Sequence, residues 1–386
     1  MQTVHAEHGT WTRVRGWLKA RGWQMPIWAA IAIVLAVGVS DHLTPQRSDA
    51  DRLRATYLSA PEYWPAPWID GDVDFVELAA ADLPPVPQPG TLAARKVALG
   101  ERLFNEPVLS KSGHIACQSC HNQRLGWGDG LPRSFGHGRT EGSRNAPPLF
   151  AAWARPAFFW DGRAETLEDQ AMGPLTAENE MANHDLSGVA HRLKWLPGYP
   201  EDFAAVYGDP EITLDRVTGA LAAFETQLDF PSRFDRFLRG EGGMLTDQQV
   251  QGLHLFRTKA RCVNCHMGPT LMDGKFHKIG LTYYERKYHD MGRYEITGDP
   301  ADAGAFLTPS LRHVGRSGPY MHNGLFPSLR GLVNLYNAGG AVQPAQPERA
   351  ARDPLFLPAT EVSPHLRPLD LTLDERAALT AFLEAL

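Results

Sequence analysis

The residues most suited to chemistry in this sequence are its four cysteines, which all lie in two short motifs of one pattern. The pattern C-x-x-C-H occupies residues 117–121 and again residues 262–266. Its two thiols lie one turn apart and can add to the two vinyl groups of a haem, while the adjacent histidine can bind the iron as an axial ligand. The motifs therefore predict two covalently bound c-type haems. The attachment residues are Cys117, Cys120 and His121 for the first haem and Cys262, Cys265 and His266 for the second.

Other uses of paired cysteines fit this pattern less well. A thiol–disulfide redox motif does not need the following histidine, and a zinc site built from both cysteine pairs does not need it twice. Two disulfides are a third use, but exported disulfide proteins rarely place every cysteine in two identical pentapeptides. We therefore interpret both motifs as haem attachment sites.

The segments that must position the two motifs also repeat. Gly-x-x-Leu-Phe occurs at residues 100–104 and at residues 252–256, each time at the end of a helix-like segment. Thr246 and Gln249 form a capping box that predicts the start of the second of these helices. The repeat indicates a mainly α fold with two cytochrome-c-like haem domains and long loops.

Two more helices are predicted at the ends of these domains. Apolar residues at helical spacing over 217–228 predict the last helix of the first domain, and a capping box at Thr372 and Glu375 predicts a helix at the end of the chain. Residues 83–90 contain four prolines, which is typical of a linker. The expected domains are a signal peptide or membrane anchor at 1–45, a linker at 46–90, the N-terminal haem domain at 91–235 and the C-terminal haem domain at 236–386.

The beginning of the sequence is typical of an export segment. A basic stretch that ends at Arg21 precedes an uncharged run at residues 25–40. This run is longer than most signal-peptide cores but shorter than the roughly 20 residues of a spanning helix. It therefore predicts either a cleaved signal peptide or a retained inner-membrane anchor, and both place the protein in the periplasm. The formal net charge of −6 argues against nucleic acid as a partner.

Several further motifs lie between and after the haem motifs, and together they resemble one known family. They are FFWDGRA at 158–164, LEDQAMGP at 167–174, EM at 180–181, GRY at 292–294, TPSLR at 308–312 and PYMHNG at 319–324. In identity, order and spacing they resemble the bacterial dihaem cytochrome c peroxidases and the MauG-like enzymes. The resemblance extends from about Leu92 to the end of the chain.

The resemblance implies an enzyme that reduces hydrogen peroxide at the first haem. Glu180 matches the family's acid/base residue and Gln170 its peroxide-positioning residue. A carboxylate is suited to this role because cleavage of the O–O bond requires a proton to move from one oxygen to the other. Trp160 matches the tryptophan between the two haems, where an indole can relay an electron. Without the resemblance, Glu180 would be interpreted as a solvated carboxylate, Gln170 as an exposed helix residue and Trp160 as a core aromatic.

The resemblance also implies further iron ligands, and these combine features of the two branches of the family. Tyr336 lies fourteen residues after His322, where the peroxidases have a methionine and the MauG-like branch has a tyrosine that binds the second haem. Met321 is the alternative ligand, and simple packing is the alternative role for Tyr336. His137 lies sixteen residues after His121 and matches the peroxidase histidine that caps the resting first iron. The alternative interpretation is that His137 is an exposed loop histidine.

The resemblance also implies a bound calcium ion and several partners. Asn145, Ser317 and Pro319 match the residues that bind an interdomain calcium ion in the family, although serine stands where threonine is more usual. Electrons are expected from a small cytochrome c, a copper protein or a membrane quinol, and a homodimer is left open. The alternative functions are a MauG-like oxidase that uses high-valent haem to modify a partner protein, and a non-catalytic dihaem electron carrier.

Overall fold

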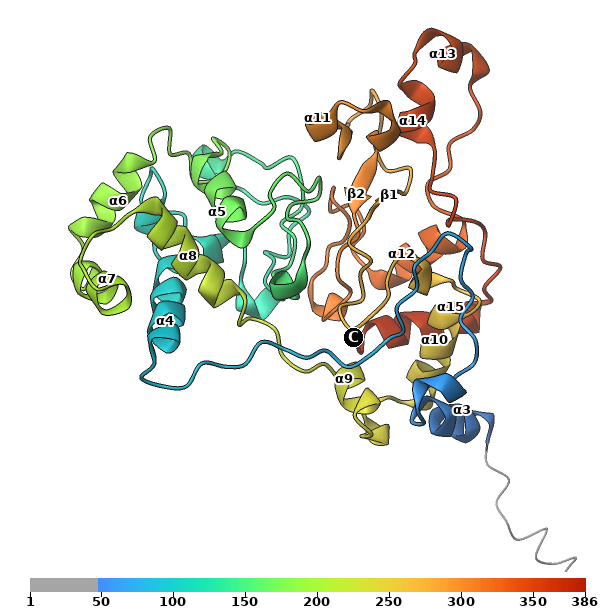
Figure 1. Cartoon of the computed structure of the whole chain (residues 1–386). Helices are drawn as coiled ribbons and strands as arrows, with labels where there is room; N and C mark the ends of the chain where they lie inside the picture. Colours follow the sequence, from blue (N-terminus) through green and yellow to red (C-terminus); the bar gives the residue numbers. More distant parts are fainter. Residues whose placement is uncertain (1–47) are drawn as a thin grey trace, which may run out of the picture. The chain divides into compact units, whose positions relative to one another are not determined.

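The computed structural model describes residues 48–386, and most of its helices fall into an N-terminal and a C-terminal group (Figure 1). The mainly helical fold predicted from the sequence is confirmed for this part of the chain. The predicted export segment at residues 1–45 lies outside the described residues. Within residues 48–386, no helix is both long enough and apolar enough to cross a membrane.

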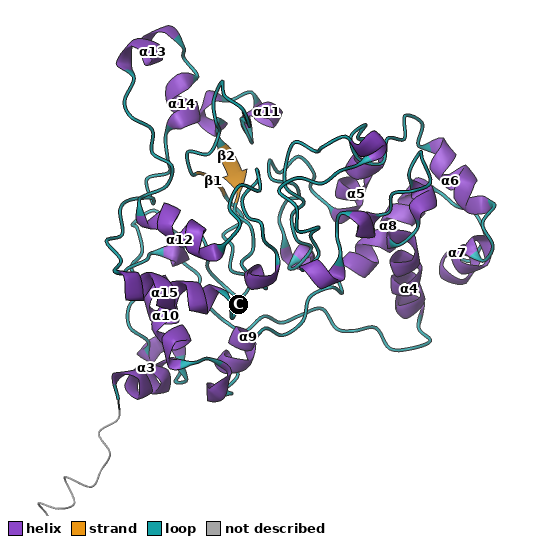
Figure 2. Cartoon of the chain, turned by 180° about the vertical axis from the view of Figure 1, so that it is seen from behind, coloured by secondary structure: helices purple, strands orange, loops and turns teal. Residues whose placement is uncertain are grey.

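The helices of the N-terminal half lie between residues 92 and 225. They are α4 (Leu92–Phe104), α5 (Leu167–Thr176), α6 (Ser187–Lys194), α7 (Tyr199–Tyr207) and α8 (Leu214–Glu225). The longest connection, between α4 and α5, is mostly loop and carries the first C-x-x-C-H motif (Figure 2). The predicted helix over 217–228 is therefore α8, which ends at Glu225, so that Leu228 lies just beyond it.

The other helices and the only strands among the described residues lie outside this region. They are α3 (Asp49–Tyr57), α9 (Arg233–Leu238), α10 (Asp247–Arg257), α11 (Tyr294–Thr297), α12 (Leu329–Asn337), α13 (Pro347–Arg352), α14 (Phe356–Thr360) and α15 (Leu373–Leu383), with strands β1 (Phe276–Lys278) and β2 (Ala305–Leu307). The strands form an antiparallel pair in which Phe276 is opposite Leu307. The sequence did not predict this small sheet. Single 3-10 turns at Cys117–Ser119 and Cys262–Asn264 each begin with the first cysteine of a pair, and the second cysteine follows the turn directly.

The predicted capping boxes are present at the start of α10 and of α15. The side chains of Thr246 and Thr372 each accept a hydrogen bond from the backbone N–H three residues later. The side chains of Gln249 and Glu375 accept one in return from the backbone N–H groups of the two threonines. These reciprocal bonds satisfy N–H groups that have no partner inside a helix, and they explain why both helices begin where the sequence predicts.

The repeated glycine marks the same helix crossing in each half. A Cβ atom at Gly100 in α4 would lie 1.9 Å from the carbonyl oxygen of Ala220 in α8. A Cβ atom at Gly252 in α10 would lie 2.1 Å from the carbonyl oxygen of Ala378 in α15. Only glycine therefore permits these two helix pairs to approach so closely, which gives the repeat a physical cause.

The phenylalanine that ends each repeat packs in a matching way. Phe104 lies 5.2 Å from Phe224 of α8, and Phe256 lies 5.4 Å from Phe382 of α15, measured between ring centroids. Both repeat phenylalanines are fully buried. The two halves are thus built on the same pair of crossed helices.

The segment before α4 packs against the C-terminal half and not against the half that it leads into (Figure 1). Tyr57, Trp64 and Leu78 belong to the same apolar core as α10 and α15. The buried guanidinium of Arg257 forms an ion pair with Glu77. We call residues 59–82 the N-terminal strap. They lie within the predicted linker at 46–90, whose exact boundaries remain a prediction.

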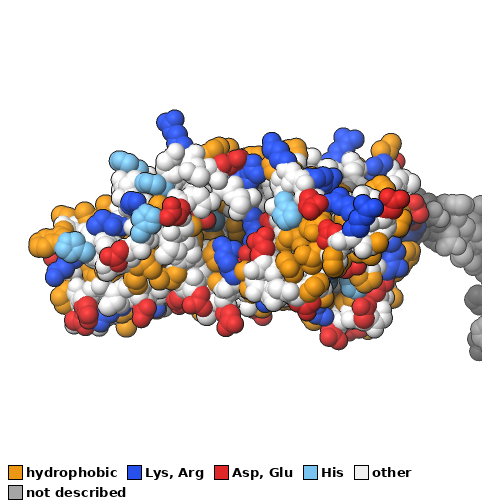
Figure 3. Space-filling model, turned by 90° about the horizontal axis from the view of Figure 1, so that it is seen from above, with side chains coloured by type: hydrophobic (Ala, Val, Ile, Leu, Met, Phe, Trp, Pro, Cys, Tyr) orange, Lys and Arg blue, Asp and Glu red, His pale blue; other side chains and the backbone are white. Residues whose placement is uncertain are grey.

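Charged side chains of both signs are interspersed on the face of the molecule seen in Figure 3. No single sign of charge covers the part of that face that the structure describes. Electrostatic attraction of a partner therefore has to come from a local patch of charge, because a mixed surface produces little net field.

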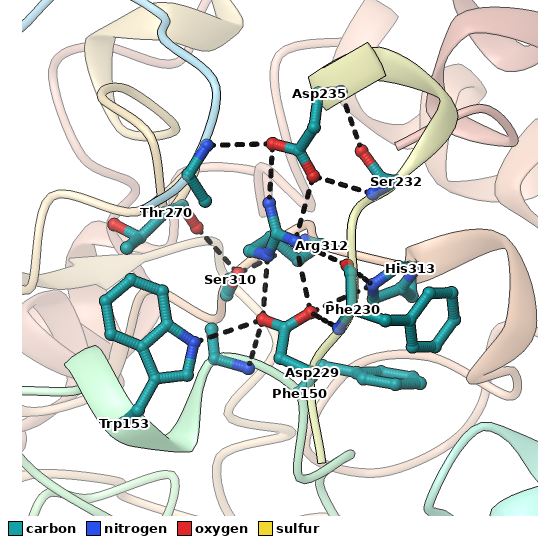
Figure 4. A network of polar contacts seen from close by, with 12 residues as sticks. Phe150, Trp153, Asp229, Phe230, Ser232, Asp235, Thr270, Ser310, Arg312 and His313 are labelled. Atoms are coloured by element: carbon teal, nitrogen blue, oxygen red, sulfur yellow. Dashed lines mark hydrogen bonds and ion pairs between the residues drawn. The ribbon is translucent and has the colours of Figure 1, made fainter. Parts of the chain in front are cut away.

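A buried ion cluster joins loops from both halves (Figure 4). Arg312 is 2% exposed and forms ion pairs with Asp229 at 2.8 Å and Asp235 at 3.0 Å. Asp229 also accepts hydrogen bonds from the backbone N–H of Ala151 and the indole of Trp153, both at 3.2 Å. The cluster thereby fixes a loop of the N-terminal half to the segment around Arg312.

Candidate haem and peroxide sites

The first C-x-x-C-H motif lines a cavity in the N-terminal half. Cys117, Cys120 and His121 all face this cavity, together with apolar side chains such as Phe104 and Leu221. The Nδ1 atom of His121 lies 2.9 Å from the carbonyl oxygen of Trp127. Because a carbonyl can only accept, Nδ1 carries the proton and Nε2 keeps the lone pair that can bind a metal.

The second motif lines an equivalent cavity in the C-terminal half. Cys262, Cys265 and His266 face it, and the Nδ1 atom of His266 lies 3.0 Å from the carbonyl oxygen of Leu271. The same tautomer is therefore held in both halves. Burial raises the pKa of the Cys262 and Cys265 thiols to about 12. All four cysteines lie in the described part, and none forms a disulfide.

Both cavities contain buried polar atoms that have no hydrogen-bond partner among the described residues. In the first cavity they include Nε of Arg155, Oγ of Ser134 and Oε2 of Glu225, and in the second cavity they include Nε2 of His322 and Nε of Arg261. Buried polar atoms are rarely left unpaired in folded proteins. An apolar cavity with a few unpaired polar atoms fits a haem, which is an apolar ring that carries two carboxylates.

The two residues expected to act on peroxide line the first cavity together. Gln170 reaches it from α5, and Glu180 reaches it from the turn that follows α5. Hydrogen bonds from the backbone N–H of Glu180 to Ala177 O and from that of Met181 to Pro174 O hold this turn. Burial raises the pKa of the Glu180 carboxyl, and the nearby Arg163 guanidinium opposes this shift. A raised pKa suits a carboxyl that has to carry a proton.

Trp160 and Asn145 line both cavities and therefore mark the place where the two cavities adjoin. The Trp160 indole N–H donates a hydrogen bond to the Asn145 carbonyl at 2.9 Å. The Asn145 N–H in turn donates to the carbonyl of His322 at 2.7 Å. These bonds connect the FFWDGRA motif of the N-terminal half with the PYMHNG motif of the C-terminal half.

Both candidate ligands for the second iron face the second cavity. Tyr336 is on α12 and Met321 lies in the preceding loop, and both line the cavity. Burial raises the pKa of the Tyr336 phenol, and the nearby thiols of Cys265 and Cys262 add to the rise. The structure therefore places both residues in the cavity without choosing between them.

His137 does not belong to the residues that line the first cavity in this structure. Its backbone N–H donates to the carbonyl of Glu180 at 2.8 Å, so the loop that carries it is tied to the turn that carries Glu180. Its Nδ1 atom is buried and has no partner among the described residues.

The three residues expected to bind calcium all line the second cavity. Asn145 is 6% exposed, and its side-chain amide donates to the carbonyl of Leu131 at 3.0 Å. This bond occupies the nitrogen and leaves Oδ1 as the side-chain atom that a cation would use. Ser317 and Pro319 lie on the loop that leads to His322.

Glu225 and His322 were not assigned a role from the sequence. Glu225 follows Leu221 by one helical turn on the apolar face of α8, and a carboxyl at such a position was a signal for a polar site. Burial raises its pKa to about 8. His322 stacks on Phe306 with ring centroids 3.7 Å apart. It lies inside a motif, but a motif alone does not reveal which cavity a side chain faces.

Two cavities of this kind in one mainly helical chain define a dihaem c-type cytochrome. The sequence model of the family described as di-haem cytochrome c peroxidase matches residues 94–243. The chain is 39% identical over 307 residues to the methylamine utilization protein MauG of Methylorubrum extorquens, covering 78% of this chain and 81% of the relative. It is 40% identical over 238 residues to the cytochrome c551 peroxidase of Nitrosomonas europaea, covering 61% and 70%.

A solved structure agrees with these relatives. A MauG-like protein associated with microbial copper homeostasis superposes with a TM-score of 0.67 at 29% identity, covering 85% of this chain and 94% of that one. The chain therefore belongs to the dihaem cytochrome c peroxidase and MauG family.

Proposed function

We propose that this protein is a dihaem peroxidase that reduces hydrogen peroxide to water at the first haem with electrons relayed through the second. The observation that carries this proposal is that Gln170 and Glu180 face the same cavity as His121. The balanced reaction takes one peroxide, two electrons and two protons to two waters. When bound, the first haem supplies an iron with an open position at which the peroxide can be reduced.

The side chains around the first cavity supply binding and proton transfer. The Gln170 amide orients the peroxide by hydrogen bonds, and Glu180 takes the proton from one oxygen and returns it to the other. The half-buried position of Glu180 supports this role, because its raised pKa lets the carboxyl hold the proton between the two transfers.

The second cavity and its border with the first serve electron delivery. His266 and Tyr336, which both line the second cavity, would hold the second haem, and Trp160 would relay electrons because it borders both cavities. Asn145, Ser317 and Pro319 bind a calcium ion near this border. His137 would cap the first iron at rest, although its side chain is not among those that line the first cavity in this structure.

We also infer a periplasmic location, because covalent c-type haems accompany a sequence that begins like an exported protein. The uncharged run at residues 25–40, which would act as a signal peptide or an anchor, lies outside the described residues.

The variant Glu180→Gln tests the central assignment. Removal of the titrating carboxyl should lower peroxide turnover by about 10²- to 10⁴-fold while both haems remain attached. The measurement is steady-state peroxide consumption with a small-molecule electron donor, together with the haem content of the purified protein.

The matched control is Glu178→Gln, two residues earlier, where the carboxylate is 80% exposed. This variant should turn over peroxide like the wild type. Full activity in Glu180→Gln, or an equal loss in the control, would remove Glu180 from its proposed role.

The second candidate function is a MauG-like oxidase that acts on a partner protein. The presence of Tyr336 in the second cavity and the likeness to the Methylorubrum protein favour it. The discriminating experiment adds one equivalent of peroxide to the fully oxidised protein without reductant. An immediate spectral change favours the oxidase, whereas no change until one haem is reduced favours the peroxidase.

A further inference from the structure

The N-terminal strap lies directly on the segment that binds the second haem. The side-chain amide of Asn264, inside the second C-x-x-C-H motif, donates to the Trp68 carbonyl at 2.9 Å and accepts from the Asp70 N–H at 2.8 Å. Further along, the Gly268 N–H donates to the Val76 carbonyl at 3.0 Å. The strap therefore contacts the chain on both sides of His266.

The outer side of the strap exposes large apolar side chains. Tyr63 is 72% exposed, Trp68 is 51% exposed and Val76 is 55% exposed. Their neighbours Trp64 and Leu78 are buried in the core beneath the strap. Trp68 and Val76 are thus held beside the second haem segment, because their own carbonyls accept the hydrogen bonds from Asn264 and Gly268.

The exposed charge of the strap is negative. Residues 59–82 contain six acidic residues and no lysine or arginine. Two of the acids are used internally, because Glu77 pairs with Arg257 and Asp70 pairs with Arg261 and Arg367.

Three other carboxylates are exposed beside the apolar side chains and form no ion pair with a residue in the range 48–386. They are Glu62, Asp72 and Asp74. Lys275 lines a small pocket with Asp74 and Val76 and forms no ion pair in the described part of the chain. The strap thus presents an apolar patch with a negatively charged border.

We propose that this strap is the docking surface for the electron donor and that the donor is a small redox protein with lysines or arginines around an apolar contact patch. The inference rests on the proposed peroxidase function, because only a protein that consumes electrons needs such a donor. Charge complementarity selects the partner, and the apolar side chains hold it once the two surfaces meet.

The position of the strap gives the electron a short path. In each encounter the donor is oxidised by one electron and the second haem is reduced by one, and two encounters supply one peroxide. The strap contacts Asn264 and Met267 directly, the latter through the Val76 N–H at 3.4 Å from its sulfur. A donor on the strap therefore lies one layer of chain away from the haem ligand His266.

The test is the double variant Asp72→Lys/Asp74→Lys in the full-length protein with both haems attached. The measured quantity is the second-order rate constant for reduction of the second haem by a lysine-rich c-type cytochrome, at low and at high salt. We expect the rate constant of the variant to be about tenfold lower than that of the wild type at low salt. At high salt the difference between the two should be smaller. Reduction by ascorbate, which needs no docking surface, should not change.

The matched control is Glu101→Lys/Glu201→Lys, which makes the same change in net charge on exposed positions of α4 and α7 in the N-terminal half. It should be reduced by the cytochrome at the wild-type rate. An equal fall in both double variants, or no fall in the strap variant, would overturn the proposal.

A second variant tests the apolar part of the surface without changing its charge. Trp68→Ala should lower the rate of reduction by the cytochrome at both salt concentrations and leave reduction by ascorbate unchanged. Wild-type rates in this variant would also count against the strap. Failure of the peroxidase function would appear differently, as absent peroxide turnover in the wild type even with ascorbate as donor.

Discussion

Glu180 and Glu225 both line the first cavity, where Glu180 is half-buried and Glu225 is buried. Glu180 lies on a turn after α5, and the Arg163 guanidinium opposes the effect of burial on its pKa. Glu225 is 6% exposed on α8 with one oxygen unpaired, and burial raises its pKa to about 8 although the Arg155 guanidinium opposes the rise. Only Glu180 lies in the peroxidase motif, which is why we propose the acid/base role for it and not for Glu225.

The variant Tyr336→Met tests the ligand of the second haem at the scale of a single residue. An anionic phenolate stabilises oxidised iron, whereas a methionine thioether favours reduced iron. The midpoint potential of the second haem should therefore rise when Tyr336 becomes methionine, as measured by a spectroscopic redox titration.

Met321→Leu is the companion variant, since Met321 lines the same cavity. It should leave that potential and the optical spectrum unchanged. A shift in Met321→Leu with none in Tyr336→Met would assign the ligand to Met321 instead.

At the scale of elements, the crossings of α4 with α8 and of α10 with α15 hold the two haem cavities. Leu221 of α8 faces the first cavity, and Phe256 of α10 and Leu379 of α15 face the second. A shift in either crossing would thus move residues that contact a haem.

The variant Gly100→Ala should destabilise the protein. The new methyl group would meet the Ala220 carbonyl oxygen at 1.9 Å, and a helix backbone cannot move far to relieve this clash. Overpacking of this kind costs about 1–3 kcal/mol, which outweighs the gain of up to about 1 kcal/mol in helix propensity. Chemical denaturation of the haem-bound protein measures the difference.

Gly331→Ala in α12 is the control for this prediction, because its nearest neighbour would be the Ser328 hydroxyl at 3.5 Å, an ordinary contact. Its stability should equal that of the wild type or exceed it by up to about 1 kcal/mol, because the gain in helix propensity meets no clash. If both alanine variants were equally stable, the repeated glycine would need another explanation.

At the scale of the whole molecule, the cluster around Arg312 makes stability depend on pH. Burial alone would raise the pKa of Asp229, but hydrogen bonds and charge from His313 and Arg312 hold it far below its usual range. The pKa of Asp235 is also lowered, because the Arg312 pairing outweighs its burial. The unfolded chain therefore binds more protons than the folded one in acid.

The free energy of unfolding should consequently be highest above about pH 4, the usual pKa of an aspartate, and should fall as the pH drops below it. Denaturant midpoints measured between pH 7 and pH 3 test this. Asp229→Asn should be less stable at pH 7 and should lose less of its stability in acid. An unchanged slope in this variant would show that other carboxyls cause the acid loss.

The sequence alone determined the features of this protein that depend on neighbouring residues. The haem attachment motifs, the capping boxes at Thr246 and Thr372 and the repeated glycines each lie within a few consecutive residues, so their chemistry and geometry are local. The mainly helical fold and the family followed from them and from the ordered motifs.

Only the tertiary structure decided which distant residues meet. It placed Trp160 and Asn145 at the border of both cavities, left His137 outside the lining of the first cavity, and folded the strap onto the second haem segment. These outcomes join residues up to about two hundred positions apart. Such contacts depend on how whole helices and loops pack together. A local sequence pattern does not predict which distant surfaces will meet.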